Sequence, residues 1–271
     1  VSVTSPSFEI PSGQERFMCM QVPFKAEADL YVSQSRAFQG PGGHHALLFY
    51  TEGDTGIDGA PHECGDADMG NIRLVGVGTA TGGGIGMPEG VAMKLPKGAQ
   101  LWTQSHYVNT TAETLVVRDE LELDLLDEAD VEHVAGSFVQ VDLGLSLPPA
   151  ATTKRSMECS PPVQMTIPWI LAHMHEYGAS FMIEVRRKGE WATIYESTWH
   201  EALRDDFPIV TMEPGFTLGP DDRIRTTCEW KNTSTETLGF PSEMCASFMP
   251  QYPSSDGSMW VCDQTGNAFQ L

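Results

Sequence analysis

The chain of 271 residues has 37 acidic and 16 basic side chains, and its formal charge of −21 argues against nucleic acid as a partner, because such binding needs a cationic surface. A hydrophobic content of 41% is enough for a folded core, yet no run approaches the roughly 18 apolar residues of a membrane-spanning helix. The 26 glycines and 18 prolines are scattered without a period, which indicates many turns.

The cysteines indicate an exported protein. Their number is even and no CxxC pair occurs, which argues against a zinc ribbon or a thioredoxin-type motif and favours three disulfides. Spacing alone leaves their pairing open. No basic, apolar signal region opens the chain, which begins at Val1 as a processed sequence does. We therefore expect a secreted protein in an oxidising compartment, either extracellular or periplasmic.

The first half of the chain predicts short strands after a polar entry arm at residues 1–13. Residues 17–22 are a strand candidate, and a glycine-rich turn precedes another at residues 44–50. Adjacent side chains of a regular strand point to opposite faces, so His44 and His45 can share a metal ion only at a strand end or an irregularity. The glycines just before the pair make such an irregularity possible.

Alternation in two further segments predicts which side chains share a face. In residues 101–107, Gln104 and His106 fall on the same face. In residues 114–125, the leucines at 121, 123 and 125 form an inner face, and the acidic run over residues 119–132 is then a solvated outer face and loop. The segments 51–70 and 79–90 are expected to be loops, because they lack the spacing of a calcium or phosphate loop.

A new alternation begins at residue 137, after the acidic run ends, and we place a domain boundary there. The two domains are residues 1–134 and 135–271. The second domain predicts strands near 163–175, 180–187, 191–197, 207–212, 223–230 and 244–250, with a hairpin turn at residues 187–190.

His173 and His175 flank Met174 and are the strongest candidate for a metal site. On a strand the two imidazoles share a face, whereas on a helix they diverge by roughly 200°. Residues 169–177 also fit a helix that stops at Gly178, and the pattern does not decide between the two. Met244 is a candidate third ligand, since a thioether beside two imidazoles suits copper, above all Cu(I), better than zinc or magnesium.

The ordered motifs resemble a known family, the copper type II, ascorbate-dependent monooxygenases, which include peptidylglycine α-hydroxylating monooxygenase and dopamine β-monooxygenase. Each motif is weak alone, but their order and spacing match over nearly the whole chain. The main matches are HH at 44–45, QxHY at 104–107, HMH at 173–175 and EMC at 243–245, with further matches at 17–20, 95–98, 147–149 and 159–172.

The resemblance implies an all-β fold of two antiparallel, jelly-roll-like β-sandwich domains side by side, with one copper in each. By this resemblance His44, His45 and His106 hold an electron-transfer copper, with Gln104 near it. His173, His175 and Met244 hold the copper at which dioxygen and substrate react. The resemblance also implies three disulfides, which are Cys19–Cys64, Cys159–Cys262 and Cys228–Cys245.

The implied reaction is hydroxylation of a C–H bond in a small organic substrate by O2, with ascorbate or a similar one-electron donor. Family members that act on peptidylglycines bind the substrate carboxylate through an arginine, an asparagine and a tyrosine. This chain has Leu171, Ala246 and Phe248 at those positions, and none of them offers a bidentate partner. We therefore expect a smaller or more apolar substrate, not a glycine-extended peptide.

Other readings of the same residues stay open. The scaffold fits a non-catalytic copper-binding protein, and the histidines alone fit a zinc hydrolase, although no HExxH motif occurs and zinc gives no role to Met244. A purely structural pair of sandwiches is a further reading. His62, His133 and His200 are expected at the surface or beside the sites. The sequence leaves the oligomeric state open.

Overall fold

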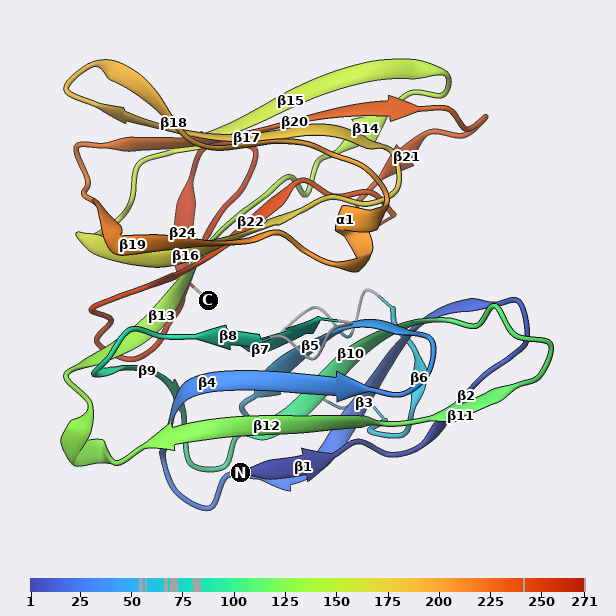
Figure 1. The fold of residues 1–271 in the computed structure, drawn as a ribbon. Coiled ribbons are helices and arrows are strands. Elements are labelled where there is room, and N and C mark those ends of the chain that lie inside the picture. Colours follow the sequence, from blue (N-terminus) through green and yellow to red (C-terminus); the bar gives the residue numbers. More distant parts are fainter. Residues whose placement is uncertain are drawn as a thin grey trace. The chain divides into compact units, whose positions relative to one another are not determined.

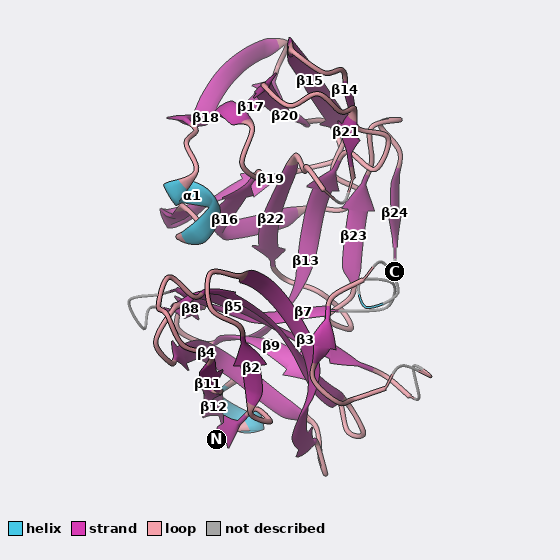
Figure 2. Cartoon of the chain, turned by 90° about the vertical axis from the view of Figure 1, so that its right-hand side faces the viewer, coloured by secondary structure: helices cyan, strands magenta, loops and turns pink. Residues whose placement is uncertain are grey.

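The computed structural model describes residues 1–53, 56, 58–65, 68, 73–79, 84–240 and 242–270. Strands dominate the chain and helix is confined to short pieces, so the expected all-β class is confirmed (Figures 1 and 2). The chain divides into two compact units, Val1–Val134 and Ala135–Leu271, at the boundary expected from the sequence. Parts of the segments 51–70 and 79–90, expected to be loops, lie outside the described residues.

The first unit is built from two main sheets and a ribbon. One sheet has the order β1 (Ser2–Thr4), β12 (Asp119–Leu126), β4 (Leu30–Gln39) and β9 (Val91–Leu95), with β8 (Gly84–Gly86) also on β4. The other has the order β6 (His62–Glu63), β3 (Glu15–Lys25), β10 (Gln100–Val108), β5 (Gly43–Thr51) and β7 (Arg73–Thr79). The ribbon pairs β2 (Phe8–Ile10) with β11 (Leu115–Val117), and a 3-10 turn, η2 (Glu128–Asp130), follows β12.

The core of the first unit lies between its two sheets. Leu48 and Leu101 enter it from one sheet, and Leu121 and Leu123 enter it from the other. Leu125 does not follow them and is 36% exposed; it lies opposite Val32, just after a register shift of β12 on β4 between residues 124 and 125. The expected polar entry arm is also wrong: β1 pairs with β12, and the side chains of β2 are part of a buried cluster.

The second unit is again a pair of sheets. One has the order β13 (His133–Val141), β22 (Ala246–Gln251), β16 (Met165–His173) and β19 (Ile209–Leu218), with β23 (Met259–Cys262) parallel to β13 and β24 (Ala268–Gln270) on β23. The other has the order β15 (Ala151–Cys159), β20 (Arg223–Asn232), β17 (Gly178–Arg187) and β18 (Glu190–Thr198). Two short strands, β14 (Ser146–Leu147) and β21 (Leu238–Gly239), form a ribbon, and α1 (Ala202–Asp205) is a single turn.

Side chains from both sheets also form the core of the second unit. Phe138 and Ile170 come from one sheet, and Phe181 and Trp230 come from the other. The expected hairpin turn joins β17 to β18, where Lys188 and the glycine after it have φ angles of 52° and 92°. Two left-handed residues in a row match the twist of the paired strands.

A buried asparagine fastens a corresponding loop in each unit. Asn109 Oδ1 accepts hydrogen bonds from the backbone and hydroxyl of Thr111 at 2.9 and 2.7 Å. Asn232 Oδ1 accepts the same pair from Ser234 at 3.0 and 2.7 Å. Both asparagines open an Asn-X-Ser/Thr pattern, but each is 1% exposed and its Nδ2 donates to backbone carbonyls. Their role in the folded chain is therefore structural.

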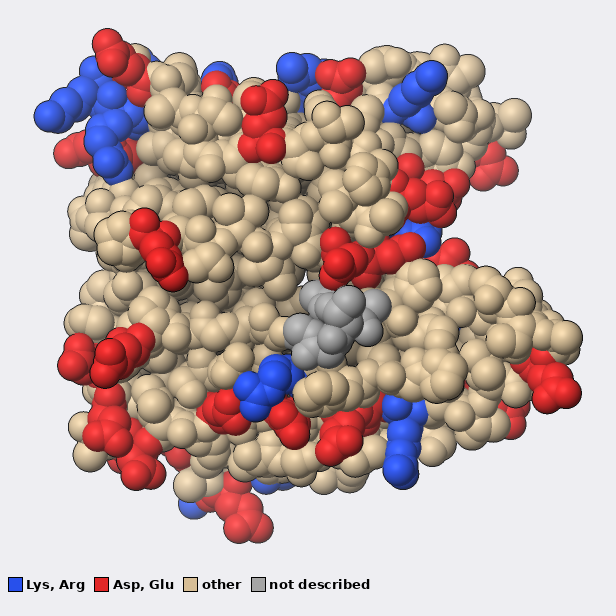
Figure 3. Space-filling view, viewed as in Figure 1, with Lys and Arg blue, Asp and Glu red and all other residues tan. Residues whose placement is uncertain are grey.

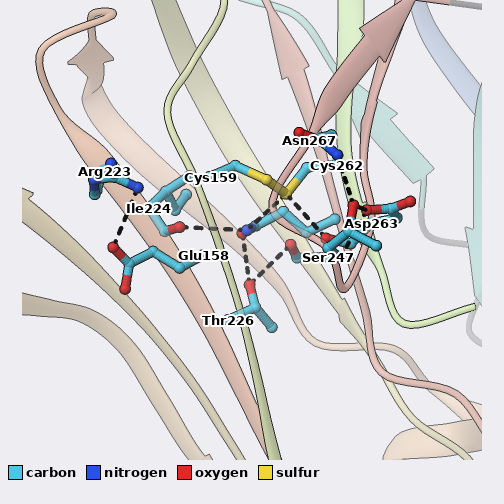
Figure 4. The surroundings of a disulfide bond; sticks show 11 residues. Glu158, Cys159, Arg223, Ile224, Thr226, Ser247, Cys262, Asp263 and Asn267 are labelled. Carbon is cyan, nitrogen blue, oxygen red and sulfur yellow. Dashed lines mark hydrogen bonds and ion pairs between the residues drawn. A yellow bond between two sulfur atoms is a disulfide. The ribbon is translucent and has the colours of Figure 1, made fainter. Parts of the chain in front are cut away.

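All six cysteines are paired, in the pattern that the family resemblance implies. Figure 4 shows the bond that joins Cys159 of β15 to Cys262 of β23, with Thr226 and Ser247 beside it. Gln140 lies against this bond, with Nε2 3.6 Å from Cys262 Sγ and with Oε1 accepting from Thr226 Oγ1 at 2.8 Å. Three disulfides fit an oxidising compartment. The bonds are Cys19–Cys64, Cys159–Cys262 and Cys228–Cys245.

The surface is strongly acidic. Figure 3 shows Asp and Glu side chains scattered over the face in view, with fewer Lys and Arg between them. Within the described ranges, no helix is long and apolar enough to cross a membrane.

Candidate metal centres

The first histidine cluster lies where β5 and β10 pair. His45 is opposite His106, but the next residue of β10, Tyr107, is opposite Gly43. His44 is therefore the extra residue of a β-bulge, which re-aims its side chain relative to a regular strand. This is the irregularity that two adjacent histidines need in order to face one ion.

The spacing of the three rings fits a shared metal ion. The ring centroid of His106 lies 5.0 Å from that of His44 and 4.9 Å from that of His45. Metal–nitrogen bonds of about 2 Å place two imidazole centroids about 4.5–5.5 Å apart at roughly right-angle to tetrahedral geometry. His45 and His106 are buried and His44 is half-buried, so the cluster is open to solvent mainly at His44.

Two side chains of β3 hold His106 in place. The ring of Phe17 stacks on its ring, with centroids 4.1 Å apart and parallel planes. Glu15 Oε1 lies 2.7 Å from His106 Nε2. An ionised carboxylate only accepts hydrogen bonds, so Nε2 has the proton and Nδ1 has the lone pair that a metal would use.

Gln104 and Asp119 lie near this cluster and differ in their burial. Gln104 is two residues before His106 on β10, at the spacing that the alternation predicts for a shared face, and it is half-buried. Asp119, expected in a solvated outer face, is instead fully buried. It accepts a hydrogen bond from Tyr107 Oη at 2.5 Å and another from the hydroxyl of Ser105. Burial raises the pKa of Asp119, and these hydrogen bonds offset part of the rise.

The second cluster lies at the end of β16, so the helical alternative for residues 169–177 is wrong. β16 ends at His173, and His175 lies two residues beyond it, where the chain enters the turn at residues 176–177. Met174 between them is 0% exposed and packs in the core between the two sheets. The period of two therefore persists past the strand end and leaves both imidazoles together, with centroids 4.9 Å apart.

The nitrogen atoms of this pair converge. His173 Nε2 and His175 Nε2 are 3.0 Å apart. Two nitrogens bound at about 2.0 Å to one ion lie about 2.8–3.3 Å apart at roughly right-angle to tetrahedral geometry, so the pair fits a shared metal. His175 Nδ1 lies 3.0 Å from the carbonyl oxygen of Ser242, which only accepts, so Nδ1 has the proton and the Nε2 lone pair faces His173.

The surroundings of His173 keep it neutral. The ring of Phe207 packs edge-to-face against it at 5.0 Å. Burial, and to a smaller degree the nearby His175, hold the pKa of His173 well below its usual range. Metal ligation needs the neutral imidazole, so this environment favours a ligand over a cation.

The backbone of Met244 is linked to the backbone of His175 through Glu243, a residue for which the sequence predicts no role. Glu243 is 0% exposed. Its Oε1 accepts from the backbone of Tyr177 at 2.7 Å, and its Oε2 accepts from Trp230 Nε1 at 3.0 Å and from the backbone of His175 and Met244 at 3.3 Å each. Burial raises the pKa of this carboxyl, and the four donors offset part of the rise.

The three residues expected at the substrate position share a face with His173. Leu171 is opposite Phe248 and His173 is opposite Ala246 where β16 pairs with β22. Leu171 and Ala246 are buried, and Phe248 packs partly buried beside Met244. The sheet surface next to the histidine pair is therefore apolar.

The other three histidines were expected at the surface or beside the sites. His62 Nε2 contacts Asp68 Oδ1 at 2.9 Å, while His133 and His200 are exposed.

No family model and no curated protein matches the chain. Among solved structures, the major capsid protein P2 of bacteriophage PM2 is 11% identical, with a TM-score of 0.35, and the match covers 94% of this chain and 99% of that chain. The VP2 subviral particle of infectious bursal disease virus is 9% identical, with a TM-score of 0.23 and coverage of 93% and 71%. At TM-scores this low, the likeness supports no conclusion about function.

Proposed function

We propose that the chain is a copper-dependent monooxygenase that hydroxylates a C–H bond of a small organic substrate with O2 and ascorbate or a similar one-electron donor. The observation that carries the proposal is the convergence of His173 Nε2 and His175 Nε2 at 3.0 Å, next to a segment that offers the thioether of Met244. Copper bound by such donors supplies one-electron redox chemistry and activation of dioxygen.

The first cluster suits the electron-transfer site. His44, His45 and His106 offer three imidazoles, which serve both Cu(I) and Cu(II). Glu15 orients His106 through Nε2, and Phe17 covers its ring, so this ligand would keep one orientation in both oxidation states of the copper. A site that does not rearrange between oxidation states transfers electrons with little reorganisation.

The second cluster suits the site of C–H chemistry. His173 is neutral and buried, and Ser242 fixes the ring of His175 through Nδ1. With Met244 these residues leave ligand positions for small molecules open. The apolar side chains of Leu171 and Phe248 would exclude water from one flank of the site.

The substrate we propose is small or apolar and is not a glycine-extended peptide. Leu171, Ala246 and Phe248 have no group that pairs with a carboxylate, and a buried carboxylate without a partner is strongly disfavoured. Secretion is part of the proposal, and three disulfides support it.

The first test is metal content and EPR on protein loaded with copper and then washed, followed by ascorbate-driven oxygen uptake with apolar substrates. Two coppers per chain with type II spectra and substrate-dependent oxygen uptake are expected. Two coppers without oxygen uptake on any substrate would favour the non-catalytic copper-binding protein. One copper, or zinc in its place, would overturn the proposal, as would efficient turnover of an acyl-glycine for its substrate part.

A further inference from the structure

Glu243 is a buried carboxylate that the proposed reaction does not use. It comes directly before Met244, and its two oxygens accept hydrogen bonds from four N–H donors. No basic side chain is among these donors. A carboxylate buried without a cation is costly, and apolar side chains of similar size usually stabilise a core better. A contribution to stability therefore does not by itself explain why a carboxylate is buried at this position.

Three of the four donors come from the two segments that carry the second cluster, and the fourth is Trp230 of β20. His175 and Tyr177 lie in the turn after β16, where the backbone has left the sheet. Met244 lies in the segment before β22. The same carboxylate therefore accepts hydrogen bonds from the backbone N–H of His175 and from the backbone N–H of Met244.

Where a strand partner would normally accept the backbone N–H groups of His175 and Tyr177, Glu243 accepts them instead. This lets the chain turn at His175 while the imidazole stays beside that of His173. The Cys228–Cys245 disulfide, one residue beyond Met244, links the Met244 segment to β20.

Resting on the proposed function, we propose that Glu243 is the positioning residue of the second copper site, which joins the His175 turn to the Met244 segment so that imidazole and thioether reach one ion. It touches neither metal nor substrate, and it acts through the backbone of the residues that do.

Glu243→Gln tests this without a change of size. A carboxamide has one accepting oxygen, so whichever way it is turned its NH2 group meets an N–H donor, either that of Tyr177 or those that share Oε2. We expect Cu(I) affinity of the second site to fall about 10–100-fold, and the copper–sulfur contribution to X-ray absorption to weaken. Affinity and EPR of the first site should not change.

Two variants separate positioning from stability. Trp230→Phe removes one donor to Glu243 but keeps the bonds to His175 and Met244, so it should lower the thermal midpoint and keep the copper–sulfur contribution. Asp119→Asn makes the same carboxylate-to-amide change at a buried position of the first unit and should leave the second copper site unaffected. If Glu243→Gln does not fold by circular dichroism, Glu243→Asp, which keeps the charge and withdraws the oxygens, replaces it.

The outcomes distinguish the two proposals. If wild-type protein shows no copper–sulfur contribution, the proposed function is wrong at this site. If wild-type protein shows it and a folded Glu243 variant keeps it with unchanged affinity, only the positioning role is wrong. An equal loss in Trp230→Phe would mean that Glu243 acts through general stability, and would also overturn the inference.

Discussion

Glu15 and His106 form a carboxylate–imidazole pair across β3 and β10, with 2.7 Å between Oε1 and Nε2. The side chain of His106 is fully buried, whereas that of Glu15 is 39% exposed. The pair fixes both the tautomer and the rotation of the imidazole and leaves the Nδ1 lone pair for a metal ion. An interaction of this kind also raises the basicity of the ligand atom.

Glu15→Gln should weaken Cu(II) binding at the first site by about 10–100-fold, because the amide removes the negative charge that polarises His106. Competition titration against a chelator of known affinity measures the change. Glu9→Gln, at an exposed position on β2, is the matched control and should bind as wild type. Unchanged affinity in Glu15→Gln would show that the pair does not act on the metal.

Met244→Ile should abolish hydroxylation while the fold and the first copper stay intact, since isoleucine preserves apolar volume but offers no ligand. Circular dichroism, copper content and ascorbate-driven oxygen uptake measure the three effects. Normal turnover by this variant would remove Met244 from the second site.

Replacement of Cys228 and Cys245 by serine should loosen the segment that includes Met244. The disulfide closes a loop of 17 residues, and its loss costs roughly 3 kcal/mol in a chain-entropy model. We expect lower Cu(I) affinity at the second site together with an earlier denaturant midpoint. The same change at Cys159 and Cys262 is the control, because it destabilises the same unit without releasing Met244. Equal Cu(I) affinity in both double variants would argue against a local effect.

Asp119 should make stability depend on pH. Its pKa is raised in the folded chain, so the folded state holds the proton more tightly than the unfolded state does. The stabilisation is fully present below the unfolded pKa, near 3.8, and is lost as pH rises through the raised folded pKa. The free energy of unfolding, measured with denaturant from acid to neutral pH, should therefore fall for wild type relative to Asp119→Asn. A wild-type free energy of unfolding that instead rises with pH relative to Asp119→Asn would mean that the native chain prefers the carboxylate.

Periodicity was a sound guide to the strands that bury one face. Leu121 and Leu123 point into the core as predicted, because a single buried face forces alternation. It failed at Leu125, which is exposed just after a register shift, and at residues 1–13, whose short strands are fixed by their partners. It also misjudged Asp119, since the burial of this carboxylate depends on donors from another strand, Ser105 and Tyr107 of β10.

What the sequence by itself determined is the local chemistry: a histidine pair after glycines, a second pair with period two, and a methionine beside a cysteine. These follow from the order of side chains along one strand. Only the tertiary structure decided the bulge at His44, the contact of Glu15 with His106 and the role of Glu243. The bulge needs β10 as the partner of β5, and the Glu15 and Glu243 contacts join residues 66 to 91 positions apart. Such partners are selected by chain packing, which no local pattern encodes.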